Sequence, residues 1–380
     1  MQIEEFKLES WLNPLDPLCT YNLGASCVKA LGVREMLEYV GEDANAVLEE
    51  LANKSLHYGE FDGSRRLKHA VAGLYRAADP SLVITTHGGT GANNMVLSEL
   101  LQPGDNVVVL TPTYQQHYSI PANLGVEVRK VRGTAENVYL PTIGEIERAV
   151  DGSTRMIVAT SPSNPAGIYV DPELMDGIVA LARTVDAYVL FDEMYRGLDD
   201  DYMPSIVDVY EKGISTASVS KVYSMAGKRV GWIAVRDRDT YERLFNRRSF
   251  DTICGSVIDE FLVAIALEHS DALLERSRRI VRANKEVLDT WMEAHPRLHY
   301  CGESHGSTAM IRYDYDLSAT EFGQRLFDEE KVLICHGDVF EEPGTFRLGY
   351  GFGDASLLVD GLAALDRFLE NLENLEKEGK

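Results

Sequence analysis

Short runs of apolar residues recur along the first two thirds of the chain and predict strands that are buried on both faces. Each run has four to six residues and few charges, as in strands covered by helices on either side. The runs are Leu82–Thr86, Val107–Leu110, Val126–Val131, Met156–Thr160, Tyr188–Phe191, Ser215–Val219 and Val230–Val235. Segments with helical periodicity lie between them, at Asn93–Leu101, Ile143–Val150 and Pro172–Thr184. This alternation predicts an α/β fold built on a mostly parallel sheet.

The pattern changes near Asp259. We expect a long charged helix over Asp259–His295, then a few strand-like pieces and a terminal helix over Ala355–Glu376. The change predicts a second, smaller domain of mixed helices and strands. We expect residues 46–258 to form the large domain, residues 259–380 to form the small domain, and residues 1–45 to pack on the small domain.

Composition narrows the class of protein. The 380 residues are 45% hydrophobic, enough for a large core, and 60 acidic against 37 basic residues give a net charge of −23. Nucleic-acid and anionic membrane surfaces attract clustered Lys and Arg, so neither partner is expected. The five cysteines are widely spaced and form no C-x-x-C pair, which favours reduced thiols over disulfides or a metal site. No run approaches the roughly 18 apolar residues of a membrane span, and we expect a cytoplasmic protein.

The stretch Ser218-Val219-Ser220-Lys221 follows a predicted strand and is the first candidate for chemistry. Lysine is rarely buried unless it is paired or chemically used. A desolvated lysine loses basicity and becomes a nucleophile for carbonyls, which is how pyridoxal 5′-phosphate (PLP) is held in proteins. Ser218 and Arg229 are near enough in sequence to reach a phosphate. A surface turn with ordinary polar residues accounts for this stretch equally well by itself.

The apolar run before Asp192 is the second candidate. It places the carboxylate at the carboxyl edge of the sheet, where α/β folds bind ligands. PLP needs an anion beside its pyridine nitrogen, because the protonated ring is the electron sink. Tyr195 could hydrogen-bond the phenolic oxygen of the ring. The alternative for Asp192 is a helix N-cap, which this stretch alone favours.

Three more turns follow predicted strands. The Gly-rich segment around Gly89 and Thr90 offers backbone N–H groups at a helix N-terminus, or only a tight turn. Tyr114 offers an aromatic face to a flat ring, or is a packed tyrosine. Asn164, in a turn rich in Pro and Gly, offers an amide to the phenolic oxygen.

The order of these features resembles the fold-type I PLP-dependent enzymes of the aspartate aminotransferase superfamily, the class I/II aminotransferases. The resemblance extends from about Tyr21 to Tyr350. Its specific spacings are the S-x-x-K step at Lys221, an Arg eight residues later and an Asp twenty-nine residues earlier. It implies a large domain with a mostly parallel seven-stranded sheet and a small α+β domain.

The resemblance also implies roles for the candidate residues. Lys221 would hold PLP as a Schiff base and move the proton between Cα and C4′. Asp192 would pair with the pyridine nitrogen, and Tyr114 would stack on the ring. The remaining cofactor contacts would be Asn164 and Tyr195 at the phenolic oxygen, and Gly89, Thr90, Ser218 and Arg229 at the phosphate.

Substrate and subunit contacts follow from the same resemblance. Arg347, in Phe346-Arg347-Leu348-Gly349, would take the substrate α-carboxylate in a bidentate pair. Gly24 and Asn164 would also contact the substrate. Tyr58 would reach the phosphate in the partner subunit, which implies a homodimer with shared active sites. No metal is expected.

Two segments depart from the common pattern of the superfamily. His336 stands where Pro is common in a Pro-Gly-x-x-Phe motif, so it is a candidate for tuning the pocket or for acid–base chemistry, or a tolerated loop substitution. Residues 21–27 lack the common glycine–acidic–proline form. This segment and the Thr-His-Gly turn weakly resemble the capreomycidine synthase branch, which cyclises a hydroxylated arginine. The acidic run 199–201 would favour a cationic substrate, unless it is only a solvated loop.

The resulting expectation is an aminotransferase that acts on a small L-amino acid and a 2-oxo acid. A β- or γ-lyase, a decarboxylase and a cyclase of an arginine derivative remain alternatives, because the fold does not decide which bond at Cα breaks. A PLP-sensing transcription regulator would need a DNA-binding domain, for which this sequence offers no basic segment. A catalytically inactive homologue is disfavoured because the predicted set of residues is intact.

Overall fold

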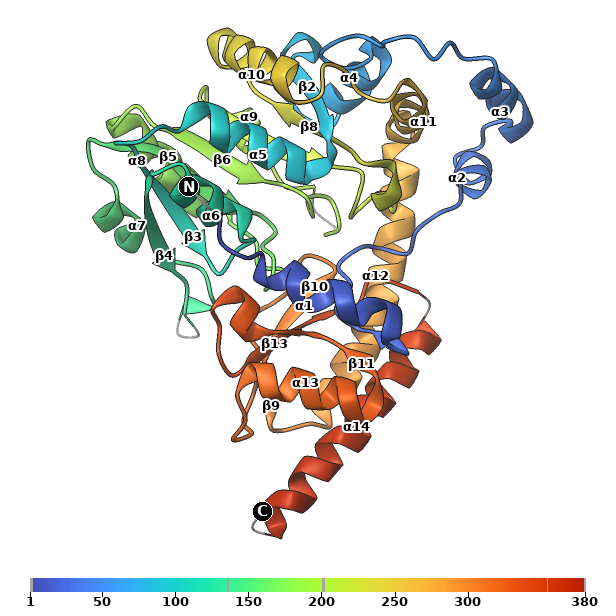
Figure 1. The fold of residues 1–380 in the computed structure, drawn as a ribbon, viewed down its shortest axis with the longest axis vertical. Coiled ribbons are helices and arrows are strands. Elements are labelled where there is room, and N and C mark those ends of the chain that lie inside the picture. Colours follow the sequence, from blue (N-terminus) through green and yellow to red (C-terminus); the bar gives the residue numbers. More distant parts are fainter. Residues whose placement is uncertain (1–2, 135–136, 200–201, 354, 379–380) are drawn as a thin grey trace.

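A computed structural model describes residues 3–134, 137–199, 202–353 and 355–378 of the 380. The chain forms two bodies, each built on its own sheet, with the larger at the top of Figure 1. Helix α12 (Ser270–Glu293) runs from one body toward the other, and α14 (Ala355–Lys377) extends along the smaller one.

The larger sheet has seven strands in the order β2-β8-β7-β6-β5-β3-β4. Strand β8 is antiparallel to both neighbours, and the other pairs are parallel. The strands are β2 (Val83–His87), β3 (Asn106–Thr111), β4 (Glu127–Arg132), β5 (Thr154–Thr160), β6 (Tyr188–Asp192), β7 (Gly213–Ser218) and β8 (Val230–Ala234). Each of the seven predicted strands is therefore present.

Helices cover both faces of this sheet. Alternate residues of β3 enter different apolar clusters, with Val108 in one and Val107 and Val109 in the other, as the two-residue period of a strand requires. The helices of this body are α4 (Arg65–Ala72), α5 (Gly88–Leu100), α6 (Gln116–Asn123), α7 (Ile143–Ala149), α8 (Pro172–Thr184), α9 (Ile206–Val209), α10 (Arg238–Asp251) and α11 (Val257–Glu268). Burial on both faces explains why these strands have few charges.

The smaller sheet is antiparallel, in the order β12-β13-β10-β9. Its strands are β9 (Leu298–Tyr300), β10 (Thr308–Tyr313), β12 (Cys335–His336) and β13 (Thr345–Gly349). Helix α13 (Ala319–Glu330) packs against this sheet, and α14 packs against α13. The N-terminal segment joins this body, because β1 (Tyr21–Asn22) pairs in parallel with β11 (Val332–Leu333). Ahead of it, α1 (Lys7–Leu15) lies between the two bodies (Figure 1), whereas α2 (Val33–Tyr39) and α3 (Ala44–Ala52) lie to one side.

One predicted element is wrong. The long helix expected over Asp259–His295 is two helices, α11 and α12, separated at His269. His269 has a non-helical backbone (φ −113°, ψ 30°), and its Nε2 lies 3.1 Å from Glu42 Oε1. The apolar run of α11 and the charged, amphipathic α12 are joined without a Gly or Pro, so the sequence pattern did not reveal the break. Among the helices of the described ranges, none is both long enough and apolar enough to cross a bilayer.

Candidate active site

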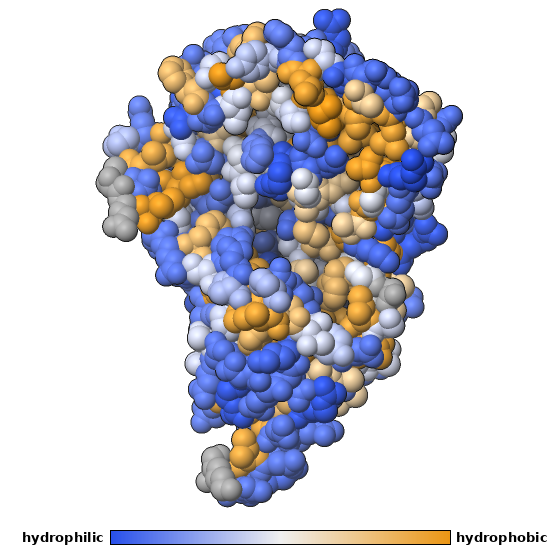
Figure 2. All heavy atoms as spheres, turned by 45° about the vertical axis from the view of Figure 1, so that its right-hand side comes forward, coloured by the Kyte–Doolittle hydropathy of each residue, from blue (hydrophilic) through white to orange (hydrophobic). Residues whose placement is uncertain are grey.

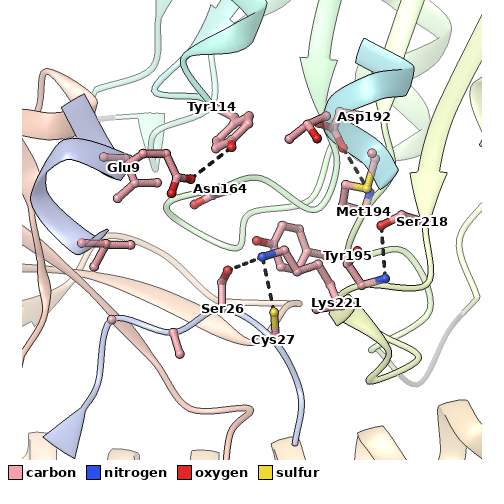
Figure 3. A pocket seen from close by; sticks show the side chains of 18 of the residues that line it. Glu9, Ser26, Cys27, Tyr114, Asn164, Asp192, Met194, Tyr195, Ser218 and Lys221 are labelled. Carbon is pink, nitrogen blue, oxygen red and sulfur yellow. Dashed lines mark hydrogen bonds between the residues drawn. The ribbon is translucent and has the colours of Figure 1, made fainter. Parts of the chain in front are cut away.

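The described part of the chain encloses a cavity of about 390 Å³ where the carboxyl ends of the parallel strands meet segments of the smaller body. The face shown in Figure 2 is hollowed between the two bodies. Eleven of the twelve predicted site residues line the cavity, namely Gly24, Gly89, Thr90, Tyr114, Asn164, Asp192, Tyr195, Ser218, Lys221, Arg229 and Arg347. Figure 3 shows several of these side chains converging from different elements.

Lys221 lies three residues after the end of β7 and is partly buried. Its Nζ donates a hydrogen bond to Ser26 Oγ (2.8 Å) and lies 3.6 Å from Cys27 Sγ (Figure 3). Burial alone lowers the pKa of Lys221, but the neighbouring Tyr195 hydroxyl and Cys27 thiol outweigh it and raise the pKa above its usual value. Burial and these two neighbours therefore act on the pKa of Lys221 in opposite directions. Ser26 and Cys27, which contact the Lys221 amine, belong to the N-terminal segment.

Asp192 ends β6 and is almost completely buried, with 3% of its surface exposed. Asn93 Nδ2 donates to its Oδ2 (2.8 Å), His117 Nε2 lies 3.2 Å from the same oxygen, and the Met194 N–H donates to Oδ1 (3.2 Å). No helix of the described chain begins at Asp192, so the N-cap interpretation is wrong. Because these contacts hold the carboxyl group from several sides, its position at the cavity is fixed.

A buried polar network supports this carboxylate. His117 Nδ1 lies 3.0 Å from Thr113 Oγ1, which lies 2.9 Å from Thr160 Oγ1. Thr216 Oγ1 donates to Asn93 Oδ1 (2.6 Å) and so orients the amide toward Asp192. Neither His117 nor Asn93 was assigned a role from the sequence. The Gly-rich turn before Asn93 pointed to backbone N–H groups rather than to its amide, and His117 lies three residues after Tyr114 in a segment for which no helix was predicted.

The N-terminus of α5 forms a cradle for an anion. The helix begins at Gly88, directly after β2, so the glycines form its first turn rather than a separate loop. Gly88 has a φ of +69°, and a Cβ there would lie 2.5 Å from Arg229 Nη2. A Cβ at Gly89 would overlap the end of Met194. Only glycine lets the helix N–H groups and the Arg229 guanidinium approach the same point, which suits a phosphate.

Arg347 in β13 is 2% exposed. Its Nη1 donates to Asn164 Oδ1 (2.7 Å), and Nη2 donates to the Gly24 carbonyl (2.6 Å) and lies 3.1 Å from Cys335 Sγ. Its Nε has no hydrogen-bond partner within the described chain. A buried, partly unsatisfied guanidinium lining a cavity is suited to a carboxylate ligand.

Tyr58 is the predicted residue that the fold does not bring to the cavity. Its side chain is 66% exposed, and it lines a separate surface hollow with residues 59–62, Arg65 and Lys68. Within one chain, therefore, Tyr58 does not meet Lys221.

Two other sequence candidates lie outside the cavity. His336 is buried against Trp11, with the ring centroids 4.6 Å apart, and burial lowers its pKa. It does not line the cavity, so the geometry gives no support to a role in acid–base chemistry. Asp199 accepts a hydrogen bond from His305 and does not line the cavity either, while residues 200 and 201 lie outside the described residues.

The sequence pattern also missed the wall formed by the N-terminal helix. Glu9 and Leu12 of α1 line the cavity, and Glu9 Oε1 accepts a hydrogen bond from the Tyr114 hydroxyl (3.4 Å; Figure 3). Burial and the Glu9 carboxylate raise the pKa of Tyr114. No sequence signal marks Glu9, because it belongs to an ordinary mixed-charge helix.

Comparison with known proteins identifies the family. Residues 26–360 match the model of the family described as "Aminotransferase class I and II". The chain belongs to this family. A PLP-dependent aminotransferase structure from Streptococcus suis 89-1591 is 34% identical, with a TM-score of 0.95 over 98% of this chain and 99% of that one. The resemblance to the class I/II aminotransferases and the predicted fold-type I architecture are thereby confirmed.

Two relatives of this chain have names that describe different activities. A capreomycidine synthase of Streptomyces vinaceus is 30% identical over 84% of this chain and 82% of its own length. An arginine–pyruvate transaminase of Pseudomonas aeruginosa is 27% identical over 81% of each chain. PLP is the cofactor of the family, so the predicted cofactor is confirmed at that level.

Proposed function

We propose that this aminotransferase-family chain transfers the amino group of an L-amino acid to a 2-oxo acid, with PLP attached at Lys221. The observation that carries the proposal is that one cavity holds a lysine, a buried anion, an anion cradle and a buried, partly unpaired arginine. Each of these groups lies in or next to a different strand, and together they match the separate parts of one cofactor and one amino acid.

The residues present fit PLP by their chemistry. Gly88 leaves room for Arg229 at the α5 N-terminus, where the phosphate would be held with Gly89, Thr90 and Ser218. Asp192, fixed by Asn93 and His117, would pair with the pyridine nitrogen. Tyr114 would stack on the ring, while Tyr195 and Asn164 would contact its phenolic oxygen. When bound, PLP supplies an electrophilic carbon for the amine and an electron sink for Cα.

The chain's own groups would then handle the substrate and its proton. Arg347 would bind the α-carboxylate, beside Asn164 and the Gly24 segment, and so orient Cα toward Lys221. Lys221 Nζ would take the proton from Cα. Ser26 Oγ, 2.8 Å from that nitrogen, would hold the free amine in place. The α1 helix between the two bodies would limit the access of water (Figure 1).

The capreomycidine synthase relative favours a second candidate, a cyclase acting on an arginine derivative. A β- or γ-lyase would use the same residues. All of these reactions begin with loss of the Cα proton, so residue identity does not separate them.

One experiment distinguishes these reactions. Given a reactive L-amino acid but no oxo acid, the purified holoenzyme should change its cofactor absorbance once and then stop. Adding 2-oxoglutarate or pyruvate should restart the reaction. Continued turnover without an acceptor, with release of ammonia, a thiol or a cyclic product, would show a lyase or cyclase instead. Borohydride reduction followed by peptide mapping should place the cofactor on Lys221, and a label on another lysine would refute the attachment.

We also propose a homodimer in which Tyr58 completes the site of the partner subunit. Its exposed position in a separate hollow supports this arrangement. The cytoplasmic location and the domain limits at residues 45 and 258 stay predictions.

A further inference from the structure

One face of the N-terminal helix and of the turn after it forms a wall of the cavity. Glu9, Leu12, Asn13 and Asp16 line the cavity, and their spacing of i, i+3, i+4 and i+7 places them on one helical face. The helix is fixed by Trp11, whose Nε1 donates to the Ile334 carbonyl (2.7 Å). The wall therefore presents two carboxylates at defined positions.

The charges in the cavity leave the Glu9 carboxylate without a counter-ion. The lining cations in the described chain are Lys221, Arg229 and Arg347, and the proposed function employs all three. Glu9 is partly buried and forms no ion pair within the described residues. Its hydrogen-bond donor there is the Tyr114 hydroxyl, which stays neutral because burial and Glu9 itself raise the pKa of Tyr114. A partly desolvated carboxylate of this kind favours a cationic ligand.

Glu9, Leu12 and Arg347 all line the same cavity. A chain of neighbouring residues leads from Arg347 through Gly24 and Leu12 to Glu9. The Arg347 Nη2 bonds the Gly24 carbonyl, and a Cβ at Gly24 would lie 3.4 Å from Leu12 Cδ2. Glu9 lies about one helical turn before Leu12 on the same helix. Arg347 is buried and lines the cavity, and its guanidinium supplies the positive charge that an anionic ligand group at that end requires. The cavity thus offers Arg347 to a carboxylate, Leu12 to methylene groups and Glu9 to a cationic group.

We propose that Glu9 determines specificity by binding the cationic side chain of a basic amino-acid substrate. The inference rests on the proposed function and names the substrate class of the same site. Arg347 would hold the α-carboxylate, Leu12 would contact the methylenes, and Glu9 would pair with a terminal guanidinium or ammonium group. A side-chain carboxylate in this position would meet like charge and be rejected.

The test uses two compounds that lack the α-amine and so cannot react. 5-Guanidinopentanoate carries the charged end group of arginine, and 5-ureidopentanoate carries a neutral group of the same shape. By calorimetry with the holoenzyme, we expect the guanidino compound to bind at least about tenfold more tightly. Glu9→Gln should remove this preference, by weakening only the guanidino compound. Glu5→Gln is the matched control, because Glu5 is exposed in the same N-terminal segment and does not line the cavity.

Several outcomes would overturn the proposal. They are equal binding of the two compounds to the wild type, binding of neither, or an equal loss of both in Glu9→Gln, which would indicate a structural role for Glu9. Because neither compound reacts, failure of the aminotransferase assay would leave this result standing on its own. As a kinetic check, L-arginine should exceed L-citrulline in kcat/KM for the first half-reaction, and Glu9→Gln should reduce only the value for L-arginine.

Discussion

Arg347 combines deep burial with an unsatisfied N–H, and this combination predicts how a substitution should behave. Its Nη groups are held by Asn164 and Gly24, while Nε has no partner in the described chain. We expect Arg347→Ala to weaken amino-acid binding by roughly 2–4 kcal/mol, because a charge-assisted pair is lost and a desolvated carboxylate is left without a partner. Cofactor content should not change. Titration of the holoenzyme absorbance with the amino acid measures the effect.

The conservative variant tests whether geometry or charge matters at this position. Arg347→Lys should recover little affinity, since an ammonium group does not reproduce the planar fork of a guanidinium. Unchanged substrate affinity in Arg347→Ala would remove Arg347 from the site, and full recovery by lysine would mean that charge alone is recognised.

At the same scale, motif spacing located the candidate residues but did not supply the neighbours that act on them. Lys221 lines the cavity as expected, yet its pKa is raised because Tyr195 and Cys27 outweigh its burial. His336 looked chemically significant because it departs from a motif, but its ring packs against Trp11. The direction and neighbours of a side chain depend on segments far away in sequence, which motif spacing does not include.

At the scale of elements, the junction between β2 and α5 is the most demanding backbone position of the site. Gly88 has a positive φ, and any Cβ would press on the Arg229 guanidinium. Gly88→Ala should reduce PLP affinity at least about tenfold, or ~1.4 kcal/mol, because it strains the helix start and displaces a phosphate contact. Titration of the apoenzyme with PLP gives the dissociation constant.

Gly91→Ala supplies the matched control in the same helix. A Cβ there meets the His87 Cβ at 3.6 Å, an ordinary contact distance, and Gly91 has no positive φ. Its PLP affinity should stay near that of the wild type. Equal losses in both variants would mean that the effect comes from α5 as a whole rather than from the Arg229 contact.

At the scale of the whole molecule, the exposed position of Tyr58 predicts an active dimer. Tyr58→Phe should weaken PLP binding, and Lys221→Ala should abolish activity. In a mixed dimer of these two variants, one site would contain both lesions and the other neither, if Tyr58 acts across the interface. Mixing the inactive and weakened proteins should therefore restore part of the activity of a normal site.

Hydrodynamic measurements complete this prediction. The active enzyme should have the mass of two chains, and exposed apolar residues near Tyr58, including Leu56 and Phe61, should become protected in the dimer. An active monomer would end the proposal. Activity of the mixture that never exceeds the sum of its components would show that Tyr58 acts within its own chain or has no role at PLP.

The sequence by itself determined the strands of the large sheet and the residues that follow them. A strand buried on both faces must be a short apolar run, and the chain after a parallel strand emerges at one edge of the sheet, so Tyr114, Asn164, Asp192 and Lys221 converge there. These are local patterns joined by one general rule of topology. Sequence reasoning therefore located that half of the site well.

Beyond Gly24 and Arg347, which the family resemblance implied, only the tertiary structure decided what faces those residues from the other side. Glu9, Ser26 and Cys27 reach the cavity because α1 lies between the two bodies and β1 pairs with β11, more than three hundred residues away in the chain. Such contacts depend on how distant segments pack, and no local pattern of hydrophobic and polar residues encodes them. For the same reason the break at His269, and the charge that we expect to select the substrate, became visible only in the folded molecule.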